Sequence, residues 1–426
     1  MRAREFVSAS ICLAVLLAAV AHAPARTPKK SPPAQQTSAN TWIETWGASQ
    51  QIPEPQNALP ADDLRDATVR QIFHFSVGGA VLRVHLTNAF STQPLHFTAV
   101  HIATPVSLST AAIDAATDKA LTFSGQNNVT IPPGAEMVSD PIQFSVQALG
   151  SVAVSYHLDT PPSRQTSHPG SRATTWYVHG DQVSAADLPD AKRIEHWYQV
   201  TGIDVVDNAP GAGTVVALGD SITDGHAATT NGNDRWTDAF AANLQSSPAT
   251  RNIAVSNRGT GGNHLLTDGL GPNALARFDR DVLAPAGVKW LIVFEGVNDL
   301  GELSIRGDAP AAAHTAMVAN IEAAYAQIII RAHAHGIRVF GATITPYAGS
   351  VYYHPFPSNE ADRQAINAWI RAPGHFDGVV DFDSVLRDPQ HPDQLIPAYD
   401  CGDHLHPSPA GYKAMGNAVP LSLFVH

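Results

Sequence analysis

Three short motifs in this chain carry side chains that together could perform nucleophilic acyl transfer. A Gly-Asp-Ser motif ends at Ser221, a Gly-Val-Asn-Asp motif places an amide at Asn298, and an Asp-His-Leu-His-Pro motif begins at Asp403. In this order they supply a hydroxyl nucleophile, an amide donor, and a carboxylate beside an imidazole. Serine-based acyl transfer needs these parts, because a base must deprotonate the hydroxyl and fixed donors must stabilise the tetrahedral intermediate.

The last motif offers two imidazoles, and the spacing favours one of them as the base. Asp403 and His406 lie three residues apart, which brings a carboxylate and a ring side by side on a single turn. Asp403 can then accept a hydrogen bond from one ring nitrogen while the other nitrogen faces Ser221. His404 points elsewhere on such a turn, so we assign His406 as the base.

Donors for an oxyanion are expected from two places. A glycine N–H can approach an oxyanion without a side chain in the way, and residues 257–263 form a glycine-rich loop. We choose Gly262 as this donor, with Gly261 and Gly259 as alternatives. Asn298 follows an apolar strand, where asparagine is often a turn former, but its amide can donate directly into a site.

From about residue 212 onward, short apolar strands alternate with helices. The pattern predicts strands at 214–218, 253–255, 289–295, 337–344 and 379–382, and helices at 236–244, 311–335, 359–371 and 409–419. This alternation indicates a parallel, doubly wound α/β sheet with helices on both faces. Ligands bind at the carboxyl ends of the strands in such sheets, and Ser221 and Asn298 both directly follow a strand. Asp220 and Asp299, beside them, are expected to brace their loops.

The preceding region, residues 41–206, has the pattern of a β-sandwich-like accessory domain. Apolar runs at 73–77, 81–86, 97–103, 129–131, 142–146, 152–157 and 197–206 are separated by Gly, Pro, Asn and Asp at the spacing of sandwich strands. Its aromatic residues suit either a core or a glycan-binding platform; they include Trp176, Tyr177, Trp197 and Tyr198. We therefore expect this domain to precede an α/β domain at residues 212–426.

The N-terminus and the composition limit where the protein acts and what it binds. Residues 1–23 have the positive start, short apolar core and small residues of a signal peptide, and residues 24–40 read as a flexible leader. No later stretch reaches the ~20 apolar residues of a membrane span, so we expect a secreted or periplasmic protein without a membrane anchor. The net charge of −12 argues against a nucleic-acid partner. Only Cys401 remains after removal of the signal, which excludes an intramolecular disulfide.

The four motif blocks, in this order, resemble those of the SGNH hydrolases, also called the GDSL esterase/lipase family. The resemblance covers about residues 212–420 and implies a flavodoxin-like three-layer fold. It implies Ser221 as nucleophile, with His406 as base and Asp403 as the residue that orients it. It also implies an oxyanion hole formed by the N–H groups of Ser221 and Gly262 together with the side chain of Asn298.

A finer resemblance points to a branch of secreted esterases associated with xylan degradation, which also carries an N-terminal β region. It rests on residues 45–49, 234–236 and 399–407, and Cys401 departs from it where serine or another small residue is expected. It favours hydrolysis of short acyl esters, acetyl esters above all, on small molecules or on plant cell-wall carbohydrate, with no cofactor and no metal. A lipase or arylesterase of broad specificity is the alternative.

Two other function classes share features with the chain. Metallophosphoesterases use Gly-Asp, Gly-Asn-His and Gly-His-x-His elements, which residues 219–220, 262–264 and 402–406 resemble in part. The opening Asp-x-His pair is missing and Leu265 stands where an acidic residue is needed, so the ligand set is incomplete. A non-catalytic glycan-binding protein is disfavoured because the serine, histidine and aspartate are all present.

Overall fold

The apolar run before Ser221 forms β15 (Gly213–Gly219), a strand of a five-stranded sheet in the computed structural model, which describes residues 40–425. All strand pairings in this sheet are parallel. The order is β16 (Ile253–Gly259), β15, β17 (Val288–Phe294), β18 (Arg338–Ala342) and β19 (Gly378–Val380). In chain order this is 2-1-3-4-5, the order of flavodoxin-like sheets, and it confirms the predicted fold class.

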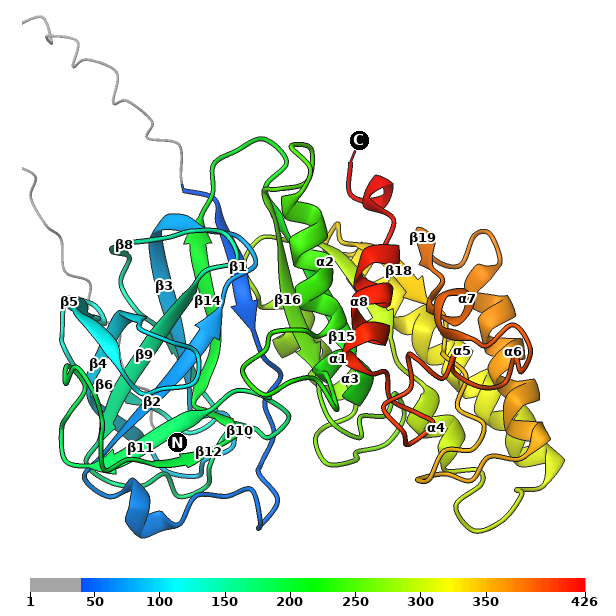
Figure 1. Cartoon of the computed structure of the whole chain (residues 1–426), viewed down its shortest axis with the longest axis horizontal. Helices are drawn as coiled ribbons and strands as arrows, with labels where there is room; N and C mark the ends of the chain where they lie inside the picture. Colours follow the sequence, from blue (N-terminus) through cyan, green and yellow to red (C-terminus); the bar gives the residue numbers. More distant parts are fainter. Residues whose placement is uncertain (1–39, 426) are drawn as a thin grey trace, which may run out of the picture. The chain divides into compact units, whose positions relative to one another are not determined.

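Helices pack around this sheet in two groups. In one group, α8 packs against α2 and α7, and Figure 1 shows α2 beside α8. In the other group, α5 packs against α3 and α6. Every residue of β15 is buried, as expected for a parallel strand covered on both faces. The helices are α1 (Ser221–Asp224), α2 (Trp236–Gln245), α3 (Ala274–Phe278), α4 (Val297–Gly301), α5 (Ala311–His333), α6 (Pro357–Arg371), α7 (Phe382–Leu386) and α8 (Pro409–Ala418), with shorter turns at η1 (Ala61–Leu64), η2 (Asp279–Leu283) and η3 (Leu421–Leu423).

Before this α/β region, defined here as residues 207–425, lies a β region of residues 40–206 made of two large antiparallel sheets and one two-stranded sheet. The two sheets share one apolar core, as in a sandwich. The first contains β1 (Trp42–Gly47), β14 (Val200–Val206), β3 (Gly79–Thr87), β7 (Glu136–Val138) and β8 (Ile142–Val146). The second contains β12 (Lys192–Ile194), β11 (Thr175–His179), β2 (Ala67–His74), β9 (Ser151–Leu158), β4 (Leu95–Pro105), β5 (Ile113–Ala120) and β6 (Val129–Ile131), while β10 (Ser167–His168) pairs with β13 (Trp197–Tyr198).

The aromatic residues considered for a glycan platform lie inside the protein. Trp176, Tyr177, Trp197 and Tyr198 are each at most 8% exposed. The ring of Trp197 packs edge-on against that of Trp46 on β1, with 4.9 Å between centroids. These side chains therefore stabilise the β region and offer no flat surface to a sugar.

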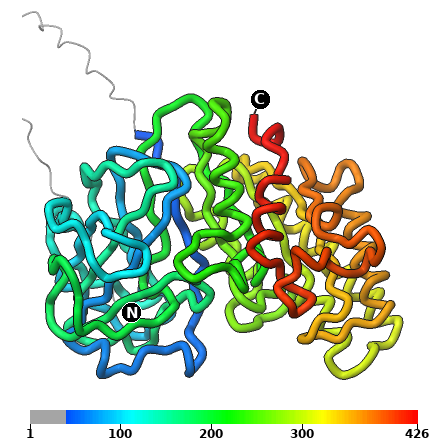
Figure 2. The backbone as a smooth tube through the Cα atoms, viewed as in Figure 1, coloured from blue at the N-terminus to red at the C-terminus, as the bar shows by residue number. Residues whose placement is uncertain are grey.

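Buried polar contacts join the two regions. Both carboxylate oxygens of Glu44 on β1 lie 2.6 Å from the Arg258 guanidinium at the end of β16. The N–H of Glu44 donates to Thr214 Oγ1 at 3.0 Å, and Ser49 Oγ donates to Asp281 Oδ2 at 2.6 Å. Strand β1 is thus packed against β16 and β15 of the parallel sheet, and Figure 2 traces the path from one region into the other.

The predicted signal peptide, and the leader up to residue 39, lie outside the described residues. Within residues 40–425, no helix combines the length and the apolar character that crossing a membrane requires.

Candidate active site

Ser221 is the first residue of the short helix α1, which directly follows strand β15. Asp220 caps that helix, because its Oδ1 accepts a hydrogen bond from the N–H of Ile222 at 2.9 Å. Gly219 must be glycine, since a Cβ there would collide with the side chain of Thr223. The strand, the tight exit and the cap together place the Ser221 hydroxyl at the carboxyl edge of the sheet.

A continuous chain of hydrogen bonds links Ser221 to Asp403 through His406. Ser221 Oγ lies 2.8 Å from His406 Nε2, and His406 Nδ1 lies 2.6 Å from Asp403 Oδ2. The other oxygen of Asp403 accepts from the N–H groups of Leu405 and His406. Partial burial alone would raise the pKa of Asp403, but these hydrogen bonds outweigh it and hold the pKa below its usual range. The carboxylate therefore stays ionised beside the imidazole.

His404 belongs to a different pair. Its Nδ1 lies 2.6 Å from Asp400 Oδ2, and its side chain is 54% exposed. Its backbone has a positive φ of 60°. The structure thus brings His406, and not His404, to Ser221.

Asn298 lies buried at the start of α4, where its amide is held in one orientation. The helix begins after Gly296, whose φ of 112° is accessible to glycine. Asn298 Nδ2 donates to the carbonyl of Asn263 at 2.6 Å, and Asn298 Oδ1 accepts from the hydroxyl of Tyr353 at 2.6 Å. An amide nitrogen carries two hydrogens, so one remains available to a ligand.

The contacts of the glycine-rich loop, residues 257–263, exclude one of the three candidate backbone donors to the oxyanion. The N–H of Gly259 already donates to Asn257 Oδ1 at 2.8 Å, and a Cβ at Gly259 would collide with the backbone of Asp224. Gly262 has a φ of 60°, a conformation that side chains disfavour. Among residues 40–425, no acceptor takes a hydrogen bond from the N–H of Gly261 or Gly262. Gly259 is therefore unsuitable as a donor, and these two glycines remain.

Buried charges underneath the site hold the loops in place. Asp299 accepts from the N–H groups of Leu265 and Leu266, so it braces the loop as expected. The fully buried Arg277 donates to the carbonyl of Gly219, to Asn263 Oδ1 and to Glu295 Oε1, and so ties the serine strand to the glycine loop. These contacts fix the relative positions of Ser221 and the donors.

The carboxyl groups of this layer are shifted in pKa. Burial raises the pKa of Asp220 to about 7, with a contribution from the nearby Asp299. Burial also raises the pKa of Glu295, together with the charge of Asp220. Because like charges in a buried layer disfavour ionisation, these groups serve as hydrogen-bonding supports.

Two polar side chains that the motifs did not indicate lie near His406, one against its ring and the other against the first. The ring of His226 stacks on that of His406, with 4.0 Å between centroids and 31° between planes. Arg172, from the β region, places its guanidinium 3.2 Å from His226 Nδ1. A guanidinium cannot accept, so Nδ1 of His226 is the acceptor and the proton sits on Nε2, 3.8 Å from Asp403. Burial, with the charges of His406 and Arg172, lowers the pKa of His226 to about 4.

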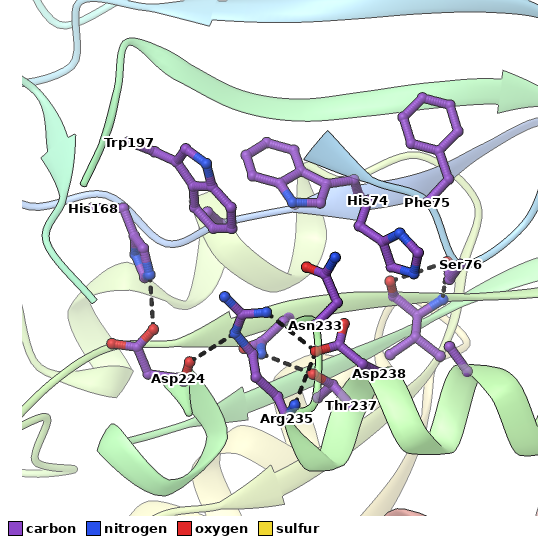
Figure 3. Close-up of a pocket in the computed structure, with 16 residues that line it drawn as sticks. His74, Phe75, Ser76, His168, Trp197, Asp224, Asn233, Arg235, Thr237 and Asp238 are labelled. Carbon is purple, nitrogen blue, oxygen red and sulfur yellow. Dashed lines mark hydrogen bonds and ion pairs between the residues drawn. The ribbon is translucent and has the colours of Figure 1, made fainter. Parts of the chain in front are cut away.

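A small cavity lies behind the serine helix, between the two regions. Its volume is about 40 Å³, which has room for ordered water rather than for a substrate. Figure 3 shows Asp224 at its wall, paired with His168 of the β region at 2.8 Å, while Arg235 Nε donates to the carbonyl of Asp224 at 3.1 Å. The β region thus supports the serine helix from behind.

Potential metal ligands gather in two places in the part of the chain that the structure describes. One group is His226, Asp403 and His406, and the other is Asp400, Cys401 and Asp403. Neither includes Asp220 or His264, which the metallophosphoesterase alternative requires. Burial raises the pKa of Cys401 to about 11, so its thiol is protonated at neutral pH and a poor nucleophile.

Several solved structures are similar to this chain. A protein of the G-D-S-L family described as putatively lipolytic, from Desulfitobacterium hafniense, is 23% identical, covers 48% of this chain and 96% of its own, and has a TM-score of 0.36. An acetylxylan esterase from Geobacillus stearothermophilus is 20% identical, with 50% and 94% covered and a TM-score of 0.37. An arylesterase, so described provisionally, from Agrobacterium tumefaciens is 19% identical, with 49% and 96% covered and a TM-score of 0.36. None of the curated proteins compared with the chain matches it.

The comparison with family models gives a match over residues 217–414 to the GDSL-like lipase/acylhydrolase family. The matched segment begins within β15 and ends within α8. Since this segment contains all the motifs around Ser221, the α/β region of the chain belongs to the GDSL-like lipase/acylhydrolase family, and the chain is a carboxylic ester hydrolase.

Proposed function

We propose that this protein is an exported serine esterase that removes short acyl groups, acetyl groups above all, from carbohydrate esters. The observation that carries the mechanism is the hydrogen-bonded chain from Ser221 Oγ through His406 to Asp403, at 2.8 and 2.6 Å. The proposed roles are nucleophile for Ser221, general base for His406 and orienting carboxylate for Asp403.

In the first half of the reaction, His406 Nε2 takes the proton from Ser221 Oγ as the oxygen attacks the ester carbonyl. Asp403 holds the proton on Nδ1 and stabilises the imidazolium that forms. The tetrahedral intermediate then collapses, and His406 gives its proton to the departing alcohol. In the second half, water takes the place of the alcohol and the acyl-enzyme is hydrolysed by the same proton transfers.

The oxyanion is assigned to donors from α1, the glycine-rich loop and α4. These are the N–H of Ser221, the N–H of Gly262 and the free hydrogen on Asn298 Nδ2. Such donors act mainly on charge that develops in the transition state, so they contribute to kcat more than to substrate binding.

The rim of the site supports a polar, carbohydrate-borne ester over a long acyl chain. Tyr352 is 49% exposed, and its ring stands edge-on to those of His406 and His226. Arg172 and His226 add polar groups on the same side. An exposed aromatic ring among hydrogen-bonding side chains suits a sugar, which presents both apolar C–H and hydroxyl groups. Export is proposed from the N-terminal sequence pattern.

A panel of p-nitrophenyl esters of increasing acyl length, run beside acetylated xylan, tests the proposal. We expect the highest kcat/KM with the acetyl ester and release of acetate from xylan. Ser221→Ala should lower kcat by several orders of magnitude while the circular dichroism spectrum stays unchanged, and a serine-reactive phosphonate should label Ser221. Near-normal turnover by Ser221→Ala would rule out the mechanism, and a maximum at long acyl chains would favour the broad-specificity lipase.

A further inference from the structure

Arg172 is a cation without a counter-ion at the rim of the active site. Within the described residues, no carboxylate lies within ion-pair distance of it, and the one hydrogen bond of its guanidinium goes to Nδ1 of His226. Its Nε is buried and has no hydrogen-bond partner. A guanidinium has five N–H donors, and a buried donor left without an acceptor is costly. The side chain as a whole is only partly buried, so the other N–H groups of the guanidinium can receive an acceptor from outside the protein.

The loop that carries Arg172 is fixed against the α/β region. The carbonyl of Arg172 accepts from the N–H of Asn231 at 2.8 Å, and the side chain of Asn231 in turn accepts from the N–H of Thr174. One residue earlier, the carbonyl of Ser171 accepts from the guanidinium of Arg235. Arg172 itself has a φ of 48°, a conformation that costs free energy in a residue other than glycine. The β region thus holds this guanidinium at a defined place.

A positive charge at this place opposes the reaction that the site performs. His406 becomes positively charged when it takes the serine proton, and only the ring of His226 separates it from Arg172. Two like charges near each other raise the free energy of that state. The whole chain also carries a net charge of −12, which repels anions. A cation kept at the rim despite these effects is explained by a ligand that brings a negative charge.

We propose that Arg172 forms an anion subsite. It selects substrates that carry a free carboxylate next to the scissile ester bond, such as uronic acids with an acyl group on a hydroxyl. The inference rests on the proposed esterase function and names its substrate class. In the complex, the carboxylate accepts two hydrogen bonds from the guanidinium fork. It also neutralises the charge beside His406, so the transition state is reached with less repulsion.

Two matched pairs of esters test the subsite. For a carboxylate on the alcohol part, 3-acetoxybenzoate is compared with 3-acetoxybenzamide; for a carboxylate on the acyl part, monoethyl succinate is compared with ethyl succinamate. The quantity measured is the ratio of kcat/KM for the acid to kcat/KM for its amide. Arg172→Gln should lower this ratio by about 10-fold to 100-fold for the pair that reaches the subsite, as expected for loss of a charged hydrogen bond. Arg172→Lys should keep part of the preference for the acid over its amide.

The control is Arg164→Gln, which removes an exposed arginine of the same region and should leave the ratio unchanged. Raising the ionic strength to about 1 M, where the Debye length is ~3 Å, should lower the wild-type ratio but not that of Arg172→Gln. An equal loss on acid and amide would mean that Arg172 only orients His226, and an unchanged ratio would mean that it binds no carboxylate. Either result overturns the proposal.

Direct binding separates this inference from the esterase function. In the Ser221→Ala background, calorimetry gives the dissociation constant for 3-acetoxybenzoate with and without Arg172→Gln. The second change should weaken binding by about 10-fold or more. If the wild type hydrolyses none of the four esters but this difference is present, the esterase function fails and the subsite stands. If hydrolysis proceeds and the dissociation constants are equal, the subsite fails alone.

Discussion

The hydroxyl of Tyr353 donates to Oδ1 of Asn298 at 2.6 Å and holds the oxygen end of the amide. On its other side the amide lies 2.6 Å from the carbonyl of Asn263, which can only accept. The nitrogen must therefore face Asn263 and the oxygen must face Tyr353. Gly301 makes room for the tyrosine, because a Cβ there would collide with the ring. Tyr353 is thus a positioning residue for the proposed oxyanion donor.

Tyr353→Phe keeps the ring and removes the contact with the amide. We expect kcat to fall about 10-fold with little change in KM, since a misoriented donor weakens stabilisation of the transition state. Asn298→Ala should cost ~10²–10³ in kcat. The double variant should be no slower than Asn298→Ala alone, because the tyrosine acts through the asparagine. Fully additive losses in steady-state kinetics would show that Tyr353 acts by another route.

The two histidines of the Asp-His-Leu-His-Pro motif should differ sharply when each is replaced. His406→Ala removes the group 2.8 Å from Ser221 Oγ and should abolish most of the activity. His404→Ala removes an exposed side chain paired with Asp400 and should leave kcat close to the wild type. The test is kcat for p-nitrophenyl acetate. A large loss with His404→Ala and none with His406→Ala would reverse the assignment of the base.

Stability should fall in alkali because of His85 in the β region. Its two nitrogens lie 2.8 Å from Glu136 and 2.9 Å from Asp204. Burial lowers its pKa, but the hydrogen bonds to Asp204 and Glu136 outweigh burial and raise the pKa to about 10. The unfolded chain has an imidazole pKa of ~6.5, so this proton stabilises the fold below that pH and the stabilisation is lost as pH rises toward 10.

Urea unfolding at a series of pH values between about 6 and 10 measures this effect. The free energy of unfolding of the wild type should decrease across the series more steeply than that of His85→Gln, which has no such proton to lose. Parallel curves for the two proteins would mean that His85 is not charged in the fold.

The contact between Glu44 and Arg258 should be needed for stability. Arg258 is buried, and burial raises the pKa of Glu44 although the charge of Arg258 opposes that shift. Glu44→Gln leaves the guanidinium buried without its carboxylate and should cost about 3–5 kcal/mol of unfolding free energy. The control is Asp63→Asn, which breaks an ion pair to the largely exposed Lys192 and should change little. If denaturant titrations give the same loss of unfolding free energy for both variants, the buried pair contributes no more to stability than the exposed one.

The sequence indicated the elements that have strong periodicity and the residues that lie in compact motifs. The strand before Ser221 and the long helix α5 have their predicted places, because apolar runs and Ala-rich stretches report burial directly. The short helices α1 and α4 were not predicted, since a single turn is too short to show a period and is held by caps and tertiary contacts.

The residues around the motifs could not be found in this way. Arg172 and His226 lie 54 positions apart in the chain and meet only because the β region folds against the α/β region. Tyr353 lies 55 positions from Asn298, in a loop with no distinctive pattern. Trp176 and Trp197 were equally compatible with a core and with a platform, because aromatic residues serve both and only packing decides.

The contacts of Glu44 and Ser49 with partners more than two hundred positions later have a consequence for how the chain can be divided. The segment that connects the two regions, around Pro210 and Gly211, is exposed. A cut there leaves each fragment with buried groups that only the other can satisfy. We expect residues 40–209 and 210–426, produced separately, to be inactive alone and to reassemble on mixing into a working split enzyme.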